Sequence, residues 1–140
     1  MTGVQTCALP ICFVGDLGDK VHDLDGDTLK VYLTNATPSA SADTIKTELA
    51  GITEENGYAA ADVTNAWSET SGVGTLTGTS ITFTAAGGDF GPFRYAVLYN
   101  DTPTDPVDPL IGWWDYGSSI TTTSGNTFTV TIGSSILTLT

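Results

Sequence analysis

Residues 91–117 of the chain read GPFRYAVLYNDTPTDPVDPLIGWWDYG, and this stretch decides which fold the rest of the sequence can adopt. Two runs, 93–99 and 110–116, are rich in aromatic and β-branched residues, which favour strands. Between them, residues 100–109 carry three prolines and three aspartates, which break strands and favour turns. The stretch therefore predicts a pair of antiparallel strands joined by a polar turn.

A register for this pair follows if Tyr99 lies opposite Leu110. The facing pairs are then Arg94–Asp115, Tyr95–Trp114 and Ala96–Trp113. Opposite charges, and a small residue beside a large one, are favourable across two strands and support this register. We expect Arg94 and Asp115 to form a bidentate ion pair inside the sheet, where loss of either partner would leave a buried charge unpaired.

Both faces of the predicted pair are apolar. One face carries Phe93, Tyr95, Val97, Tyr99, Leu110, Trp114 and Tyr116, and the other carries Ala96, Leu98, Ile111 and Trp113. A two-layer sandwich buries only one face of each sheet, so the second face needs a flanking segment or another protein chain. We therefore expect self-association or binding to a larger protein lattice. The candidate interface and structural residues are Arg94, Tyr95, Trp113, Trp114, Asp115 and Tyr116.

Alternating apolar and polar residues predict further short strands along the chain. They fall at residues 28–34, 63–68, 75–77, 80–85, 118–123, 127–132 and 136–139. Helical spacing predicts at most two short helices, within 13–22 and 43–55, although the second segment fits an irregular connection equally well. Eight or nine strands separated by glycine turns predict an all-β protein, an antiparallel β-sandwich, with the jelly roll as one candidate topology.

Composition limits the classes of function. The 140 residues fit one domain with a modest core, and 16 acidic against four basic residues give a net charge of −12. Such a surface repels nucleic acid, because phosphate binding needs clustered Lys and Arg. A run of about 18 apolar residues, which a transmembrane helix needs, is absent from the sequence.

The first twelve residues, MTGVQTCALPIC, resemble the translation of a sequencing adapter and have no charge and no strand or helix period. We therefore expect residues 1–12 to be a non-native segment and residues 13–140 to form the single β-sandwich domain. Cys7 and Cys12 then carry no information about a disulfide. Residues 13–140 contain no cysteine, so they offer neither a disulfide framework nor a cysteine metal site.

The residues that could carry chemistry do not form a recognisable motif. His22, the single histidine, stands beside an acidic turn at 23–27 and is expected to face solvent. This turn, DLDGD, begins like a calcium loop, but Thr28 and Thr34 occupy the positions where an EF-hand needs Gly and Glu. An acidic turn is the preferred interpretation, and we expect no cofactor, no metal and no enzymatic activity.

The large aromatic residues allow a second interpretation. Trp67, Trp113, Trp114 and Tyr116 could form a sugar-stacking platform, although aromatic residues of this size more often belong to a core.

Three stretches, GPFRYAVLYNDTPTDPVDPLIGWWDYGSS, KVHDLDGDTLKVYLTNATP and FTVTIGSSILTLT, resemble a group of small proteins of tailed bacteriophages. The similarity spans residues 13–140 and implies a structural protein located in the virion. A capsid decoration (cement) subunit bound to the head lattice is the first expectation. A tail-associated carbohydrate-binding or adhesion module is the alternative, and a secreted hydrolase is a weaker third reading.

The resemblance also implies partners. These are other virion proteins, either the major capsid protein or tail proteins, and further copies of the chain in a homo-oligomer. Nucleic acid and membrane are not among the expected partners, and the resemblance implies no catalytic residues.

Overall fold

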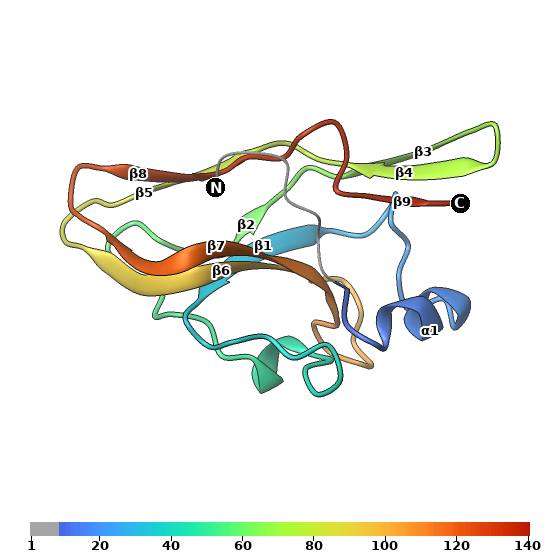
Figure 1. Cartoon of the computed structure of the whole chain (residues 1–140), viewed down its shortest axis with the longest axis horizontal. Coiled ribbons are helices and arrows are strands. Elements are labelled where there is room, and N and C mark those ends of the chain that lie inside the picture. The colour runs from blue at the N-terminus through green and yellow to red at the C-terminus, as the bar shows by residue number, and fades with distance from the viewer. Residues whose placement is uncertain (1–8) are drawn as a thin grey trace.

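The computed structural model describes residues 9–140, which contain nine strands, one short α-helix and one 3-10 turn (Figure 1). In chain order the elements are α1 (Phe13–Gly18), β1 (Leu29–Thr34), η1 (the 3-10 turn, Lys46–Glu48), β2 (Ala61–Asp62), β3 (Ala66–Thr70), β4 (Val73–Thr77), β5 (Ile81–Thr84), β6 (Phe90–Asn100), β7 (Leu110–Thr122), β8 (Thr127–Val130) and β9 (Leu137–Leu139). All strand pairs in this part of the chain are antiparallel. The predicted all-β class is confirmed, as is the short helix within residues 13–22.

Two layers of strands enclose the main core. In Figure 1 the sheet β2-β1-β6-β7 forms the lower layer, and the sheets β3-β4-β9 and β5-β8 lie above it. Buried side chains of both layers meet between them, such as Val31 and Leu98 from below and Leu76, Phe83 and Val130 from above. The fold is an antiparallel β-sandwich, as the sequence predicts.

The strand pairs are nested along the chain. β6 pairs with β7, β5 with β8 and β4 with β9, so each pair encloses the previous one. A jelly roll folds a ribbon of eight strands nested in this way. Within residues 9–140, however, β3 pairs back with β4 and β1 adds to β6, so the nesting ends after three pairs. The topology shares the folded ribbon of a jelly roll but not its complete set of pairs.

The lower sheet is buried on both faces. Its outer face carries a second cluster of buried residues, which are Tyr32, Leu49, Val97, Tyr99 and Leu110. The Tyr32 hydroxyl donates a hydrogen bond to the Leu49 carbonyl oxygen (2.7 Å), and residues 35–50 run beneath the sheet in Figure 1. The alternation in residues 28–34 predicts a half-buried strand, which is wrong because this covering segment also buries Tyr32 and Thr34.

The covering segment is extended rather than helical. Apolar spacing predicts a helix over residues 43–55, but within that range, all of it described, η1 is the one helical turn. Ile45 instead forms a bridge with Pro109, and the Ile52 N–H donates to the Leu33 carbonyl (2.9 Å). These bonds to the sheet and its connecting turn outweigh the weak helix preference, so the irregular connection is the correct alternative.

The central pair has the predicted start but a different register. Tyr99 lies opposite Leu110, as expected, and the register then shifts by one residue. The facing pairs become Leu98–Gly112, Val97–Trp113, Ala96–Trp114 and Tyr95–Asp115. The predicted facings of Tyr95 with Trp114 and of Ala96 with Trp113 are therefore wrong. The cause is a β-bulge, in which Ile111 of β7 has no facing residue on β6. A shift of one residue moves each following β7 side chain to the face opposite the predicted one.

The start of the described chain contacts the rest of the domain. The Ile11 N–H donates to the Ala40 carbonyl (2.7 Å), Pro10 is buried, and Cys12 precedes α1. Burial raises the pKa of the Cys12 thiol to about 11. Residues 1–8, including Cys7, lie outside the described residues. In the described part of the chain no helix is long and apolar enough to cross a membrane.

Candidate functional site

The expected ion pair between Arg94 and Asp115 is present, but at the surface. Arg94 Nε donates to Asp115 Oδ1 (2.7 Å) and Nη2 donates to Oδ2 (2.8 Å), so the contact is bidentate. The two side chains are 40% and 42% exposed, which contradicts the expectation of a buried pair. The reason is a second register shift, because Phe93 faces Ile120 whereas Tyr95 faces Asp115.

This shift makes residues 116–119 project from β7 as an insertion opposite Arg94, and we call them the β7 bulge. Asp115 Oδ1 also accepts the Gly117 N–H (2.7 Å), and Gly117 has a φ of +96°, which favours glycine. At the other end the Ser119 hydroxyl donates to Asn35 Oδ1 (2.8 Å). Tyr116, 40% exposed, packs its ring edge-on to a neighbouring aromatic ring. The bulge is thus fixed at both ends.

The aromatic residues do not gather into a stacking platform. Trp114 belongs to the main core, whereas Trp113 packs against the cluster on the outer face of the lower sheet. Trp67 lies on β3 in the upper layer, and Tyr116 lies on the β7 bulge. The platform of four residues is therefore wrong, because neighbouring strand residues point to opposite faces. Tyr95 is buried, with the Arg94 guanidinium 5.2 Å from its ring centroid.

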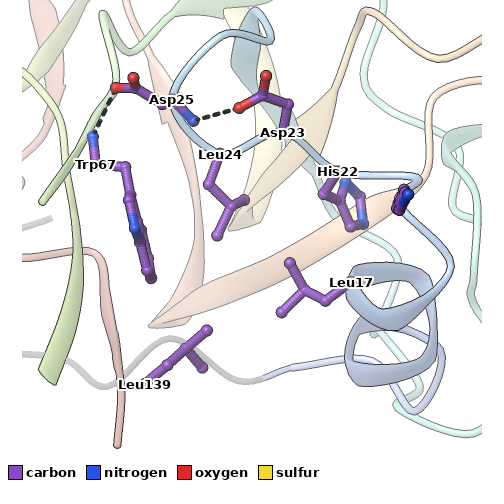
Figure 2. A pocket seen from close by; sticks show the side chains of 8 residues that line it. Leu17, His22, Asp23, Leu24, Asp25, Trp67 and Leu139 are labelled. Carbon is purple, nitrogen blue, oxygen red and sulfur yellow. Dashed lines mark hydrogen bonds between the residues drawn. The ribbon is translucent and has the colours of Figure 1, made fainter. Parts of the chain in front are cut away.

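A pocket of about 400 Å³ opens at the end of the sandwich where α1 lies, and we call it the α1-end pocket (Figure 2). Its walls are apolar side chains from α1, the loop after it, β3 and β9, namely Leu17, Leu24, Trp67 and Leu139. Figure 2 shows Trp67 and Leu139 on one side, Leu17 and His22 on the other, and Leu24 between them. Lys20, His22, Asp23 and Asp25 supply the polar groups. A pocket of this size falls in the ~300–1,000 Å³ range of small-ligand sites.

The position of Trp67 in this pocket is fixed from two sides. A Cβ on Gly74 of the neighbouring strand would overlap the Trp67 indole, so the missing side chain makes room for the ring. The Trp67 backbone N–H donates to Asp25 Oδ1 (3.2 Å), which joins β3 to the acidic turn. The indole and the turn therefore form one wall of defined geometry.

The acidic turn at residues 23–27 is held by its own carboxylates. Asp23 Oδ1 accepts the N–H groups of Asp25 (3.2 Å) and Gly26 (3.0 Å), and Asp27 Oδ2 accepts the Asp23 N–H (2.9 Å). This is the pattern of an Asx-type turn, in which side-chain oxygens replace backbone acceptors. Across residues 9–140, no group of three or more His, Cys, Asp or Glu side chains is arranged to hold a metal ion.

His22 is buried, which corrects the expectation that it faces solvent. Asn100 Nδ2 donates to Asp27 Oδ2 (2.6 Å) and lies 3.2 Å from His22 Nδ1. Because a carboxylate can only accept, the amide nitrogen faces both groups, and His22 Nδ1 must be an acceptor. His22 Nε2 then carries the proton; among the described residues it has no hydrogen-bond partner, and it lies 3.9 Å from Asp16. Burial lowers the pKa of His22, so the ring is neutral at pH 7.

A second, polar hollow of about 310 Å³ adjoins the first, and we call it the acidic pocket. The two pockets share Lys20 and Asp23. The remaining carboxylates of the acidic pocket belong to Asp19, Asp27 and Asp105. One end of the molecule therefore places an apolar pocket directly beside an acidic one.

Sequence reasoning found part of this end of the molecule. It identified the acidic turn and Trp67, but it placed Trp67 with the wrong partners. It missed Leu17, Leu24 and Leu139, because short apolar runs do not show which of their residues line a pocket in the folded chain. Comparison with known proteins found no family model, no curated protein and no solved structure that matches the chain.

Proposed function

We propose that the chain is a non-enzymatic structural protein of a tailed-bacteriophage virion, and specifically a capsid decoration subunit that binds the head lattice. The observation that carries the proposal is the resemblance of residues 13–140, centred on residues 91–119, to small proteins of such phages. In support, the sandwich has one end at which the α1-end pocket and the acidic pocket adjoin.

We propose a different route of attachment from the one that the sequence predicts. The second apolar face of the β6–β7 pair is covered by residues 35–50, from which Leu49 joins the buried cluster on that face. That face is therefore not available for self-association or for a lattice contact. Copies of the chain would gather because each binds a neighbouring site on the head, and attachment would run through the end of the sandwich.

A tail-associated carbohydrate-binding module is the second candidate, favoured by one observation. Trp67 lies in the α1-end pocket beside Asp23 and Asp25, and an indole face with nearby carboxylates can stack on a sugar and accept its hydroxyl protons. In this alternative Trp67 is the one tryptophan that would contact the sugar, because Trp114 packs in the main core and Trp113 against the outer cluster.

Copy number separates these candidates. Particles of a phage that encodes this chain would be purified and their proteins quantified by mass spectrometry against isotope-labelled peptide standards. A decoration subunit is expected at a copy number comparable with that of the major capsid protein, because one site repeats over the whole head. A copy number near that of the tail proteins would favour the tail module. Absence from purified particles would overturn both.

A further inference from the structure

We infer that the α1-end pocket and the acidic pocket together receive an extended segment of a partner virion protein, in which a large aliphatic side chain is followed by Lys or Arg. The inference rests on the proposed function, since it takes the partner to be a protein of the particle. Three features of the described residues support it: the apolar wall, the adjoining charge and an open strand edge.

The apolar wall is an unfilled end of the core. Leu137 of β9 packs against the main core, and Leu139, two residues further along the same face, lines the pocket. Leu24 is buried, while Leu17 and Trp67 are partly exposed around the opening. An aliphatic side chain inserted here would continue the row of core residues and remove the exposed apolar surface from water.

The neighbouring charge selects a cation beside that anchor. The acidic pocket holds Asp19, Asp23, Asp27 and Asp105 against Lys20, in a chain of net charge −12. Asp23 Oδ1 accepts N–H groups of the turn, and Asp25 Oδ1 accepts the Trp67 N–H of β3. The Oδ2 atoms of both residues accept no hydrogen bond within the described chain. These oxygens suit the donors of a guanidinium or ammonium group, whereas an anionic ligand would be repelled.

The open edge explains why the occupant is an extended segment. β9 is the edge strand of the sheet β3-β4-β9, and in the described residues its outer side pairs with no other strand. A peptide can add to such an edge through backbone hydrogen bonds, with alternate side chains pointing into adjacent pockets. Because Leu139 belongs to β9 and lines the α1-end pocket, a strand added there would lie beside the opening.

A second copy of the chain does not supply this occupant. The sequence has four basic residues, and three of them are engaged: Lys30 with Asp101 (2.6 Å), Lys46 with the Tyr99 hydroxyl (3.3 Å) and Arg94 with Asp115. The fourth, Lys20, lies at the pockets themselves. We therefore take the cation to come from a different protein.

Four capped dipeptides test the ligand chemistry in the full chain labelled with ¹⁵N: N-acetyl amides of Leu-Arg, Leu-Gln, Leu-Glu and Ser-Arg. Binding is followed by the NMR shifts of the Trp67 indole N–H and the Asp25 amide. We expect Leu-Arg to bind about tenfold more tightly than Leu-Gln, a difference of ~1.4 kcal/mol, and Leu-Glu and Ser-Arg to bind more weakly still. Equal binding of Leu-Arg and Leu-Glu would overturn the inference.

A matched pair of variants tests the site. Asp25→Asn removes a charge at the pocket but keeps an oxygen that can accept the Trp67 N–H. Glu55→Gln removes the same charge at an exposed position that lines neither pocket. Asp25→Asn should weaken Leu-Arg but not Leu-Gln, and Glu55→Gln should change neither. Equal weakening by both variants would show a general charge effect and contradict the site.

The outcomes separate this inference from the proposed function. If the chain is abundant in particles but the dipeptides show no preference, the pocket inference fails and the decoration role stands. If Leu-Arg binds as expected but the chain is absent from particles, the ligand chemistry stands and the virion partner is overturned. If lactose shifts the Trp67 signal and none of the dipeptides does, the pocket belongs to the carbohydrate candidate.

Discussion

Arg94 and Asp115 form a bidentate ion pair at the point where β6 and β7 lose their common register. On one side of this point Tyr95 faces Asp115, and on the other Phe93 faces Ile120, so Arg94 stands opposite the β7 bulge. The pair closes the base of that insertion. Its exposure means that solvent screens the attraction, so the pair shapes the bulge more than it stabilises the fold.

The two partners of this pair should not be equivalent. Asp115→Ala removes the acceptor of both Arg94 and the Gly117 N–H, whereas Arg94→Ala leaves the Gly117 bond in place. We expect thermal unfolding to show a larger loss of Tm for Asp115→Ala than for Arg94→Ala. Hydrogen exchange at the Gly117 amide should accelerate markedly only in Asp115→Ala. An equal loss in both variants would show that the ion pair, and not the turn, dominates.

The covering segment should contribute strongly to stability. Leu49 is 2% exposed and seals the outer face of the lower sheet, so Leu49→Ala should cost about 2–5 kcal/mol of unfolding free energy, measured by urea denaturation. Val107→Ala is the control, because Val107 is 56% exposed, and it should change the unfolding free energy by no more than ~0.5 kcal/mol. Similar small effects in both would mean that residues 35–50 do not pack on the outer face of the lower sheet in solution.

Sequence patterns predict the strands that bury one face only, because apolar and polar residues then alternate along the strand. β5 and β8 alternate cleanly because one side of each faces the core, and the start of the β6–β7 register follows from the turn that joins them. The bulges at Ile111 and at residues 116–119 left no such trace, since an inserted residue changes pairing without changing composition. The predicted partner of each β7 residue from Gly112 to Asp115 is therefore wrong by one position.

The sequence also does not show which single polar residues are buried. His22 stands in a polar stretch, and only the fold brings Asn100, 78 residues further along the chain, to both His22 and the nearby Asp27. The pocket depends in the same way on tertiary structure, because Leu17, Trp67 and Leu139 come from three separate elements.

Acid should destabilise the protein through His22. Its pKa is lowered in the fold by burial, against the opposing pull of the Asp16 and Asp27 carboxylates, so the unfolded chain binds a proton more readily. Stability is fully present above the unfolded pKa of 6.5 and falls as the pH drops from there toward the folded pKa, by up to about 1.4 kcal/mol per pH unit. Chemical denaturation between pH 7.5 and 5 measures this slope.

His22→Gln is the control for this slope, because Gln does not titrate and can accept from Asn100 Nδ2. The variant should show a flat profile over the same range. Asp115 and Glu48 do not interfere: the Arg94 hydrogen bond lowers the pKa of Asp115, the Thr44 hydrogen bonds lower that of Glu48, and both titrate at lower pH. A slope that survives in His22→Gln would assign the acid sensitivity to other groups.

Removal of residues 1–12 should leave the domain intact. Of residues 9–12, Pro10 is buried, Ile11 donates its N–H to the Ala40 carbonyl, and Cys12 precedes α1. A chain that begins at Phe13 should melt within about 2 °C of the full chain, since a shift of that size corresponds to well under 1 kcal/mol. Differential scanning calorimetry of the two chains gives the comparison. A larger drop in Tm would show that the segment belongs to the folded domain.

The most direct test of lattice attachment through the α1 end is hydrogen–deuterium exchange of the chain, free and bound to phage heads stripped of it. Slower exchange on binding is expected in β9 and residues 20–27, which line the two pockets, and unchanged exchange in the β7 bulge at the surface. Protection confined to the β7 bulge, or no binding to heads at all, would contradict the account.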